Sequence, residues 1–292
     1  SAASNLTFSL IMTGDTEKAF SVAKKLATEF PNNSQCQMPI IDLIHNLSSY
    51  NFEKNKFTNT QSELASILSR IDEIDLKNLE LIKSIFSECF ALIQKNNIYA
   101  KTNDSQIYFG RRSLLDCTRY KTVFENFSVI PEDCFGCYKI QVEASSLLNL
   151  VRVLIVLNKS DLIKTNPAKC MIEKRERVEG TYKALIYCSS LLEAKDLARR
   201  FSIILNAYST KVFIKRGCSE YALTFPEYGV INDSEKIKFE YKTSWKVFEK
   251  RVYSKFRSQK DLTPVCFDEQ LSLFTIKNLL IVANWISYSA KL

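Results

Sequence analysis

The sequence predicts an α+β protein, with helices in its first hundred residues and alternating strands and helices after them. Three observations support this fold class. Apolar residues recur at helical spacing before residue 100, short segments alternating apolar and polar residues follow between residues 137 and 217, and five of the six glycines lie between Gly110 and Gly229. At 292 residues the chain exceeds the usual length of one domain, about 100 to 200 residues. We expect an α-helical region over residues 1–105, an α+β domain over 106–220, and a helical extension over 221–292 that packs on the α+β domain.

The composition is that of a folded protein without a membrane span. Hydrophobic residues make up 46% of the chain and charged residues 25%, both ordinary for a soluble globular protein. The longest apolar segments, residues 147–157 and 271–288, are interrupted by Arg152 and Lys277, so neither is an unbroken run of about 20 apolar residues. Nine cysteines, an odd number in a chain too large to need disulfide crosslinks, predict reduced thiols and a cytoplasmic location. Several Asn-x-Ser/Thr triplets keep a secreted glycoprotein as the alternative.

The formal charge of +8 is spread unevenly along the chain. Residues 1–100 carry 9 basic and 11 acidic side chains, residues 101–220 carry 20 and 13, and residues 221–292 carry 11 and 8. The three segments therefore have formal charges of −2, +7 and +3. This asymmetry predicts that a nucleic acid or another polyanion would bind the region 101–292.

A helix is predicted over GDTEKAFSVAKKLATEFPNN, because its apolar residues share one stripe, Asp15 is placed to cap it and Pro31 to end it. Further stripes follow in MPIIDLIHNLSSY, SELASILSRI and NLELIKSIFSECFALIQ. Within residues 14–33, Gly14-Asp15, Glu17-Lys18-Ala19 and Pro31-Asn32-Asn33 resemble the second helix and exit turn of a tetratricopeptide (TPR) repeat. No second copy at the spacing of that family is obvious. The resemblance implies a scaffold of helical hairpins that binds a partner protein.

Four short strands are predicted at residues 137–143, 169–175, 180–188 and 211–217. An apolar helix, SSLLNLVRVLIVLNK, separates the first two strands, and an amphipathic helix, SSLLEAKDLARRFSIIL, separates the last two. The order βαββαβ is that of the ferredoxin-like fold. In such a sheet the four strands lie in the spatial order 4-1-3-2, so the beginnings of strands 1 and 2 share an edge with the ends of strands 3 and 4.

The carboxy-terminal segment predicts a loop over 218–229, a strand over 236–242 and two helices. The first helix, SWKVFEKRVYSKFR, has an apolar face and basic residues around the rest of its surface. The apolar face consists of Trp245, Phe248, Val252 and Phe256. We expect this face to pack against its own domain, with docking on a membrane or a nucleic acid as the alternative.

The predicted topology gathers five cysteines along one edge of the sheet. They are Cys134, Cys137, Cys170, Cys188 and Cys218, at or beside strand ends. If these cysteines bind a metal ion, we expect its thiolate ligands to be Cys134, Cys137, Cys188 and Cys218, with Cys170 as the alternate ligand. Such a set would suit a structural zinc ion, or less well an iron–sulfur cluster.

Two other interpretations of these cysteines stay open. They could be buried apolar residues without chemistry, as we expect for Cys36, Cys89 and Cys117. They could instead support thiol chemistry, with Cys218 or the Cys134/Cys137 pair as the reactive group and Lys215, Arg216 and Glu220 beside it. A cysteine–histidine pair is not expected, because the single histidine, His45, lies far away in sequence.

The sheet face that points away from the two helices is predicted to carry Lys139, Lys183 and Lys215 with Tyr187 and Phe213. Aromatic and basic side chains on an open sheet can bind RNA, although burial against other parts of the chain is the competing expectation. The segment YFGRRSLLDC adds Arg111 and Arg112 at a predicted helix start, a candidate phosphate cradle. The predicted anion-binding set is therefore Arg111, Arg112, Lys139, Lys183, Lys215 and Arg216.

The sequence contains none of the Gly-rich phosphate loop, His-Glu-x-x-His or Gly-x-Ser-x-Gly signatures of enzymes. We therefore expect a non-enzymatic binding or adaptor protein with a basic α+β surface for an anionic partner. The alternative is an enzyme that acts on a phosphorylated or other anionic substrate at the cysteine edge. Its candidate catalytic residues are Cys218, Arg216 and Glu220.

Overall fold

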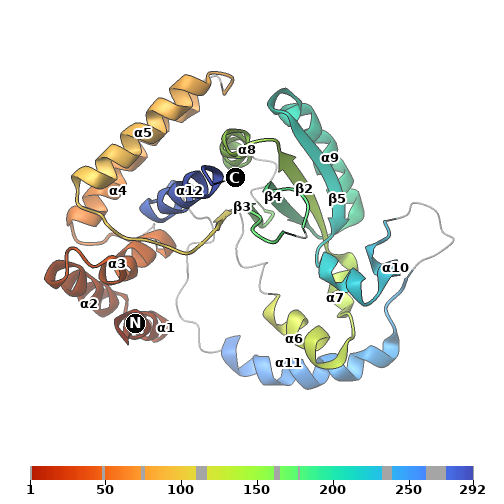
Figure 1. The fold of residues 1–292 in the computed structure, drawn as a ribbon. Helices are drawn as coiled ribbons and strands as arrows, with labels where there is room; N and C mark the ends of the chain where they lie inside the picture. Colours follow the sequence, from red (N-terminus) through yellow and green to blue (C-terminus); the bar gives the residue numbers. More distant parts are fainter. Residues whose placement is uncertain are drawn as a thin grey trace. The chain divides into compact units, whose positions relative to one another are not determined.

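The computed structural model describes residues 2–47, 50–73, 76–109, 117–160, 165–176, 178–231, 239–260 and 274–291. It contains helices and an antiparallel sheet, which confirms the predicted α+β class. The chain forms two compact units (Figure 1). We call residues 1–109 with 262–292 the helical unit and residues 110–261 the sheet unit. No helix in the described ranges has both the length and the hydropathy needed to cross a bilayer.

The helical unit contains six α-helices and one short strand in its described residues. They are α1 (Ala2–Met12), α2 (Thr16–Glu29), α3 (Ser34–Asn46), α4 (Lys56–Ser69), α5 (Leu79–Lys95), β1 (Gln106–Phe109) and α12 (Ile276–Ser289). The sequence predicted the helical stripes but not the strand β1, which is only four residues long.

The turn between α1 and α2 follows from two residues. Gly14 has a φ of +81°, a left-handed conformation that a side chain would disfavour. Asp15 then caps α2 by accepting a hydrogen bond from the Lys18 N–H at 3.2 Å. The capped helix buries Ala19 and Ala23 completely, so α1 and α2 pack closely as a hairpin.

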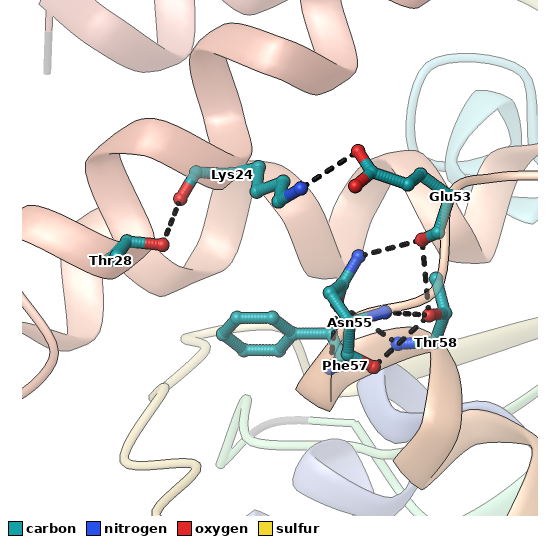
Figure 2. A network of polar contacts seen from close by, with 6 residues as sticks. All are labelled: Lys24, Thr28, Glu53, Asn55, Phe57 and Thr58. Carbon is teal, nitrogen blue, oxygen red and sulfur yellow. Dashed lines mark hydrogen bonds and ion pairs between the residues drawn. The ribbon is translucent and has the colours of Figure 1, made fainter.

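A polar network fixes the start of α4 and ties it to α2 (Figure 2). Asn55 and Thr58 form a capping box, in which each side chain accepts a hydrogen bond from the other residue's backbone N–H. Asn55 also donates to the Glu53 carbonyl at 3.0 Å, while the Glu53 carboxylate pairs with Lys24 Nζ of α2 at 2.7 Å. The cap and the ion pair together set where α4 begins relative to α2.

The carboxy-terminal helix α12 packs with α3, α4 and α5 in the helical unit. The prediction that all of 221–292 packs on the α+β domain is therefore wrong for this helix. His45 and Thr275 hydrogen-bond at 2.8 Å, Gln61 accepts from the Ile276 N–H at 3.0 Å, and Lys277 pairs with Asp42 at 2.8 Å. Sequence periodicity predicts the apolar face of this helix, but it does not predict which unit of the chain the face packs against.

The sheet unit contains four strands in the order β3-β4-β2-β5. They are β2 (Tyr138–Ala144), β3 (Ala168–Ile172), β4 (Tyr182–Cys188) and β5 (Thr210–Arg216), and each neighbouring pair is antiparallel. This order and pairing agree with the expected arrangement of the four predicted strands. β2 is the central strand, with Ile140 opposite both Ile186 of β4 and Ile214 of β5.

Helices α8 (Leu147–Lys159) and α9 (Leu191–Leu205) pack on the sheet. The residues predicted to face the helices include Ile140, Val142, Ala184 and Ile186, and all four are fully buried. Ser146 and Ser190 cap the two helices by accepting hydrogen bonds from the N–H groups of Asn149 and Glu193. The register of the strands thus places one apolar face under both helices.

An aromatic core lies beside the sheet in the same unit. It is built by α6 (Thr118–Phe127), α7 (Glu132–Gly136), the 3-10 turn Ser219–Leu223, α10 (Pro226–Gly229) and α11 (Lys246–Lys260). Figure 1 shows α11 lying along α6. Phe248, Val252 and Phe256 of α11 belong to this core together with Trp245, which ends the 3-10 turn Thr243–Trp245 just before α11, and this confirms the predicted apolar face. The strand predicted over 236–242 is absent from its described residues, 239–242, which have no regular structure.

We predict that Trp285→Ala destabilises the protein by about 3 to 5 kcal/mol. Trp285 is 1% exposed, and its indole N–H donates to the Ser105 carbonyl at 2.9 Å within the helical unit. Its neighbour Ile286 is 45% exposed, so Ile286→Ala should cost less than about 0.5 kcal/mol. Urea unfolding of both variants checks this, and equal losses would contradict the packing assigned to α12.

Candidate functional site

Cys218 lies where the sheet meets the aromatic core. It comes two residues after the end of β5 and occupies the N-cap position of the 3-10 turn Ser219–Leu223. Cys134 comes from α7, and Cys117 occupies the capping position of α6. Three separate elements therefore bring three thiols together around Cys218, which we call the Cys218 cluster.

The approach of α7 to the end of β5 depends on Gly217. Its N–H donates to the Cys137 carbonyl at 3.0 Å, which continues the β2–β5 ladder by one residue. A Cβ at Gly217 would lie 2.2 Å from Cys137 Sγ, a distance no side chain can tolerate. Glycine is thus required here for Cys137 to pack against the chain just before Cys218.

Cys117, Cys134 and Tyr221 lie close enough to Cys218 for their S–H and O–H groups to hydrogen-bond to its sulfur. These hydrogen bonds, with the nearby Lys139 ammonium, lower the pKa of Cys218, although burial opposes the shift. Donating to Cys218 raises the pKa of Cys134, and burial adds to that increase. Of this group, Cys218 is therefore the thiol whose charged form is favoured.

Lys139 provides the positive charge beside this thiolate. It lies on β2 and is buried, and its Nζ donates to the Gly217 carbonyl and to Ser219 Oγ, both at 3.0 Å. Burial lowers the pKa of Lys139, while the nearby Glu220 and Cys218 raise it. Lys139 therefore hydrogen-bonds to the residues on either side of Cys218 and lies close enough to favour the thiolate form of Cys218.

The other cysteines predicted at this edge differ from Cys218. Burial raises the pKa of Cys137 to about 11 and that of Cys188 to about 12. Cys137 is a neighbour of both Cys218 and Cys188, so these three do lie along one edge with Cys134. Cys170 does not share it: it lies opposite Ala184 in mid-strand, because β3 begins at Ala168 and ends at Ile172. Burial alone raises the pKa of Cys170.

The eight cysteines of the described ranges are free thiols. Within those ranges, no three Cys, His, Asp or Glu side chains are arranged as ligands of one metal ion. The structure therefore offers Cys134, Cys137, Cys188 and Cys218 as neighbours rather than as a preformed tetrahedral set.

Arg216, predicted to bind an anion or to assist catalysis, is engaged inside the fold. Its guanidinium donates to the Phe135 and Tyr228 carbonyls at 2.8 and 3.1 Å and to the Tyr138 hydroxyl at 2.7 Å. It also stacks over the Tyr138 and Tyr228 rings. The geometry makes Arg216 a link between α7, β2 and α10, with Nε and Nη1 donating to the protein itself.

The remaining predicted anion-binding residues are scattered. Lys183 is buried and donates to the Glu179 carbonyl at 2.8 Å, with Glu173 at 3.5 Å. Lys215 is exposed on β5. Arg111 and Arg112 lie outside the described residues. Glu220 is exposed and acts on Lys139 through its charge.

Sequence reasoning missed one member of the Cys218 cluster, Cys117, and its neighbour Tyr221. Cys117 was expected to be a buried residue without a role, and Tyr221 was part of a predicted loop. Both reach Cys218 because α6 and the turn after β5 share the aromatic core, where the Phe124 and Tyr221 rings stack with centroids 4.2 Å apart. No local pattern signals this contact, since residues 117 and 218 are far apart in sequence.

Comparison with protein-family models, with curated proteins and with solved structures finds no significant match to the chain. The site must therefore be interpreted from its own geometry.

We predict that iodoacetamide at about pH 6 alkylates Cys218 well before the other cysteines of the sheet unit. Its pKa is lowered in the folded protein, so its thiolate persists below the ordinary thiol pKa, whereas Cys134, Cys137, Cys170 and Cys188 have raised pKa values. By linkage, the stability that this thiolate contributes is present above the ordinary thiol pKa and is lost as pH falls through the folded-state pKa. Peptide mapping by mass spectrometry gives the order of modification.

A matched pair of variants tests the cause. Tyr221→Phe removes a donor to Cys218 and should move the midpoint of the pH dependence of its alkylation upward by roughly one pH unit. Tyr228→Phe removes a hydroxyl that donates instead to the Cys134 carbonyl at 2.9 Å, and should change this midpoint little. If both variants react like the unmodified protein, the hydrogen bond from Tyr221 is not what favours the thiolate.

Proposed function

We propose that the sheet unit is a thiol-dependent redox module whose reactive group is Cys218. The observation that carries this proposal is the placement of three potential hydrogen-bond donors, Cys117, Cys134 and Tyr221, around one sulfur. A sulfur surrounded by donors and close to an ammonium group is favoured as a thiolate, the form that reacts with peroxides and disulfides. Two of the donors are themselves thiols, so a partner for disulfide formation is already in contact.

The reaction can be written with a peroxide as the oxidant. The Cys218 thiolate attacks one peroxide oxygen, the O–O bond breaks, and Cys218 becomes a sulfenic acid while hydroxide, or an alkoxide, leaves. The thiol of Cys134 or Cys117 then attacks the Cys218 sulfur, forming a disulfide and releasing water. Two electrons pass from the two sulfurs to the peroxide, and an external dithiol, or two molecules of a monothiol, must return them to restore the dithiol.

The proposed fold of the module is ferredoxin-like. The strand order β3-β4-β2-β5 and the placement of α8 and α9 between the strands of each βαβ half support this assignment. The hypothesis of an enzyme that binds an anionic substrate through Arg216 loses its main support, because that guanidinium already donates to three groups of the protein. The thiol part of the same hypothesis is the part we retain.

We expect brief treatment with hydrogen peroxide to join Cys218 to Cys134 or Cys117 by a disulfide. Non-reducing peptide mapping identifies the pair, and Cys218→Ser should abolish it because the attacking thiolate is gone. Cys170→Ser is the matched control, since Cys170 is fully buried on β3 and burial alone shifts its pKa.

The same sample separates this function from a metal-binding role. Less than about 0.2 equivalents of zinc or iron in protein purified without chelator would be consistent with a free-thiol site. One equivalent of zinc, with the thiols protected from peroxide, would replace the redox proposal by a structural metal site.

A second function, binding of a partner protein by the helical unit, is favoured by a separate observation. An open depression of about 950 Å³ lies at the turn between α2 and α3 and is lined by Phe30, Pro31, Asn32, Asn33, Ser34, Tyr99 and Lys101. Phe30 and Tyr99 are 51% and 46% exposed, so both rings are accessible to a partner. Together with the TPR-like residues of this turn, the depression supports an adaptor role in which a peptide contacts these rings.

Peptides selected by phage display against the full chain test this second function. We expect Phe30→Ala and Tyr99→Ala each to weaken the selected peptides by about tenfold, the loss typical of a central aromatic contact. Leu81→Ala, at a site on α5 that is 40% exposed, serves as the control. Selected peptides that bind all three variants equally would show that the depression is not the binding surface.

A further inference from the structure

The strand β5 lies at the end of the sheet unit's strand order. Among the residues that the structure describes, β2 is the one strand of this unit paired with it. β5 is seven residues long, and its side chains alternate between half-buried and exposed along its whole length. A strand of this length at a sheet edge is a template on which another extended chain can add.

The register shows which backbone groups of β5 point outward. Gly217 donates to Cys137 directly opposite it, so alternate residues from Gly217 back along the strand bond to β2. Lys215, Phe213 and Lys211 are therefore in hydrogen-bonded pairs with β2. Ile214 and Val212 direct their N–H and C=O groups away from β2, where an added strand would meet them.

The exposed side chains of β5 belong to the residues that alternate with Val212 and Ile214 along the strand. Lys211, Phe213 and Lys215 share one face, Phe213 is 40% exposed, and Lys215 Nζ lies 5.9 Å from the centre of its ring. For a strand added antiparallel on the outer side, these residues occupy the non-hydrogen-bonded positions, where opposing side chains come closest. An added strand would thus place one side chain against each of the three.

The charge of the sheet unit indicates which kind of strand would pair with β5. The sheet unit contains 28 Lys and Arg against 18 Asp and Glu, a formal charge of +10, whereas the rest of the chain contains 12 and 14. If β5 paired with a second copy of itself centred on Phe213, Lys211 of one copy would oppose Lys215 of the other. Like charges directly opposite each other destabilise a strand pair, so an acidic strand fits this edge better than a second copy does.

We propose that the β5 edge binds an extended acidic segment of a partner protein. The segment carries acidic side chains opposite Lys211 and Lys215 and an apolar side chain opposite Phe213. This interaction uses neither the Cys218 sulfur nor the depression of the helical unit, so it stands or falls apart from the functions proposed above.

Fluorescence polarisation tests the proposal with the full chain. The probe is a labelled peptide whose core reads Glu-Thr-Val-Thr-Glu, and the comparison peptide reads Lys-Thr-Val-Thr-Lys. We expect the acidic peptide to bind more tightly than the basic one. Lys211→Glu/Lys215→Glu should weaken it by about tenfold, because two attractive cross-strand pairs become repulsive. The double variant Lys250→Glu/Lys255→Glu, with the same charge change on the exposed side of α11, should lose less than about threefold, a purely long-range effect.

A backbone variant separates strand addition from simple charge attraction. Val212→Pro removes an N–H that points to the open edge while keeping every hydrogen bond to β2, so the variant should fold yet bind the acidic peptide several-fold more weakly. Circular dichroism confirms folding, and Cys218→Ser should bind like the unmodified chain. Equal affinity for both peptides, no binding of either, or full binding by Val212→Pro would overturn the proposal. Self-association through this edge, or binding of a single-stranded oligonucleotide in place of the peptide, would also overturn it.

Discussion

The pairing of β2 with both β4 and β5 is the interaction on which the sheet unit depends. It places Tyr138 opposite Cys188 on one side and Arg216 on the other. Once this register is set, the start of β2, the end of β4 and the end of β5 must share an edge. The segment before β2 and the segment after β5 then meet, and Cys134, Cys137 and Cys218 meet with them. A shift of one residue would turn Ile140 and Val142 away from the helices, so the apolar face of the sheet and the position of the thiols have the same cause.

The same register leaves Lys139 and Lys183 of the basic sheet face inside the fold, while Lys215 and Phe213 of that face stay exposed. Lys139 and Lys183 point away from the helices, as their positions predict, but both are buried and donate to backbone carbonyls at the two ends of the sheet. A buried ammonium must be hydrogen-bonded, and these two lysines satisfy the requirement within the chain. Glu173 supports Lys183, and hydrogen bonds from Arg175 hold the pKa of Glu173 at about 2. Alternation predicts the direction of such side chains, but not what covers them.

Much of the fold could be predicted from the sequence because its signals are local. The helices α2 and α9 have caps and apolar stripes, and the strands β2 and β4 alternate over seven residues. The strand order then follows from general rules of chain connection. The site was less predictable, since Cys117 reaches Cys218 only through the aromatic core, whose members come from several separate elements. Strand boundaries mattered as well: a shift of β3 by one residue at its start and three at its end leaves Cys170 in mid-strand, away from the edge.

The charge pair formed by Lys139 and the Cys218 thiolate bears on the direction in which a disulfide at this site would react. The buried ammonium is stabilised by the nearby thiolate, and the thiolate by the ammonium, so each charge offsets part of the other's desolvation. Converting Cys218 to a disulfide would remove the negative charge and leave Lys139 with two neutral acceptors, the Gly217 carbonyl and the Ser219 hydroxyl. The oxidised form would therefore be destabilised relative to the dithiol. A disulfide whose reduced form is stabilised in this way is easily reduced and acts as an oxidant toward other thiols. If the module cycles, its own electrostatics favour the return to the dithiol, which suits a site that passes oxidising equivalents onward rather than one that stores a permanent crosslink.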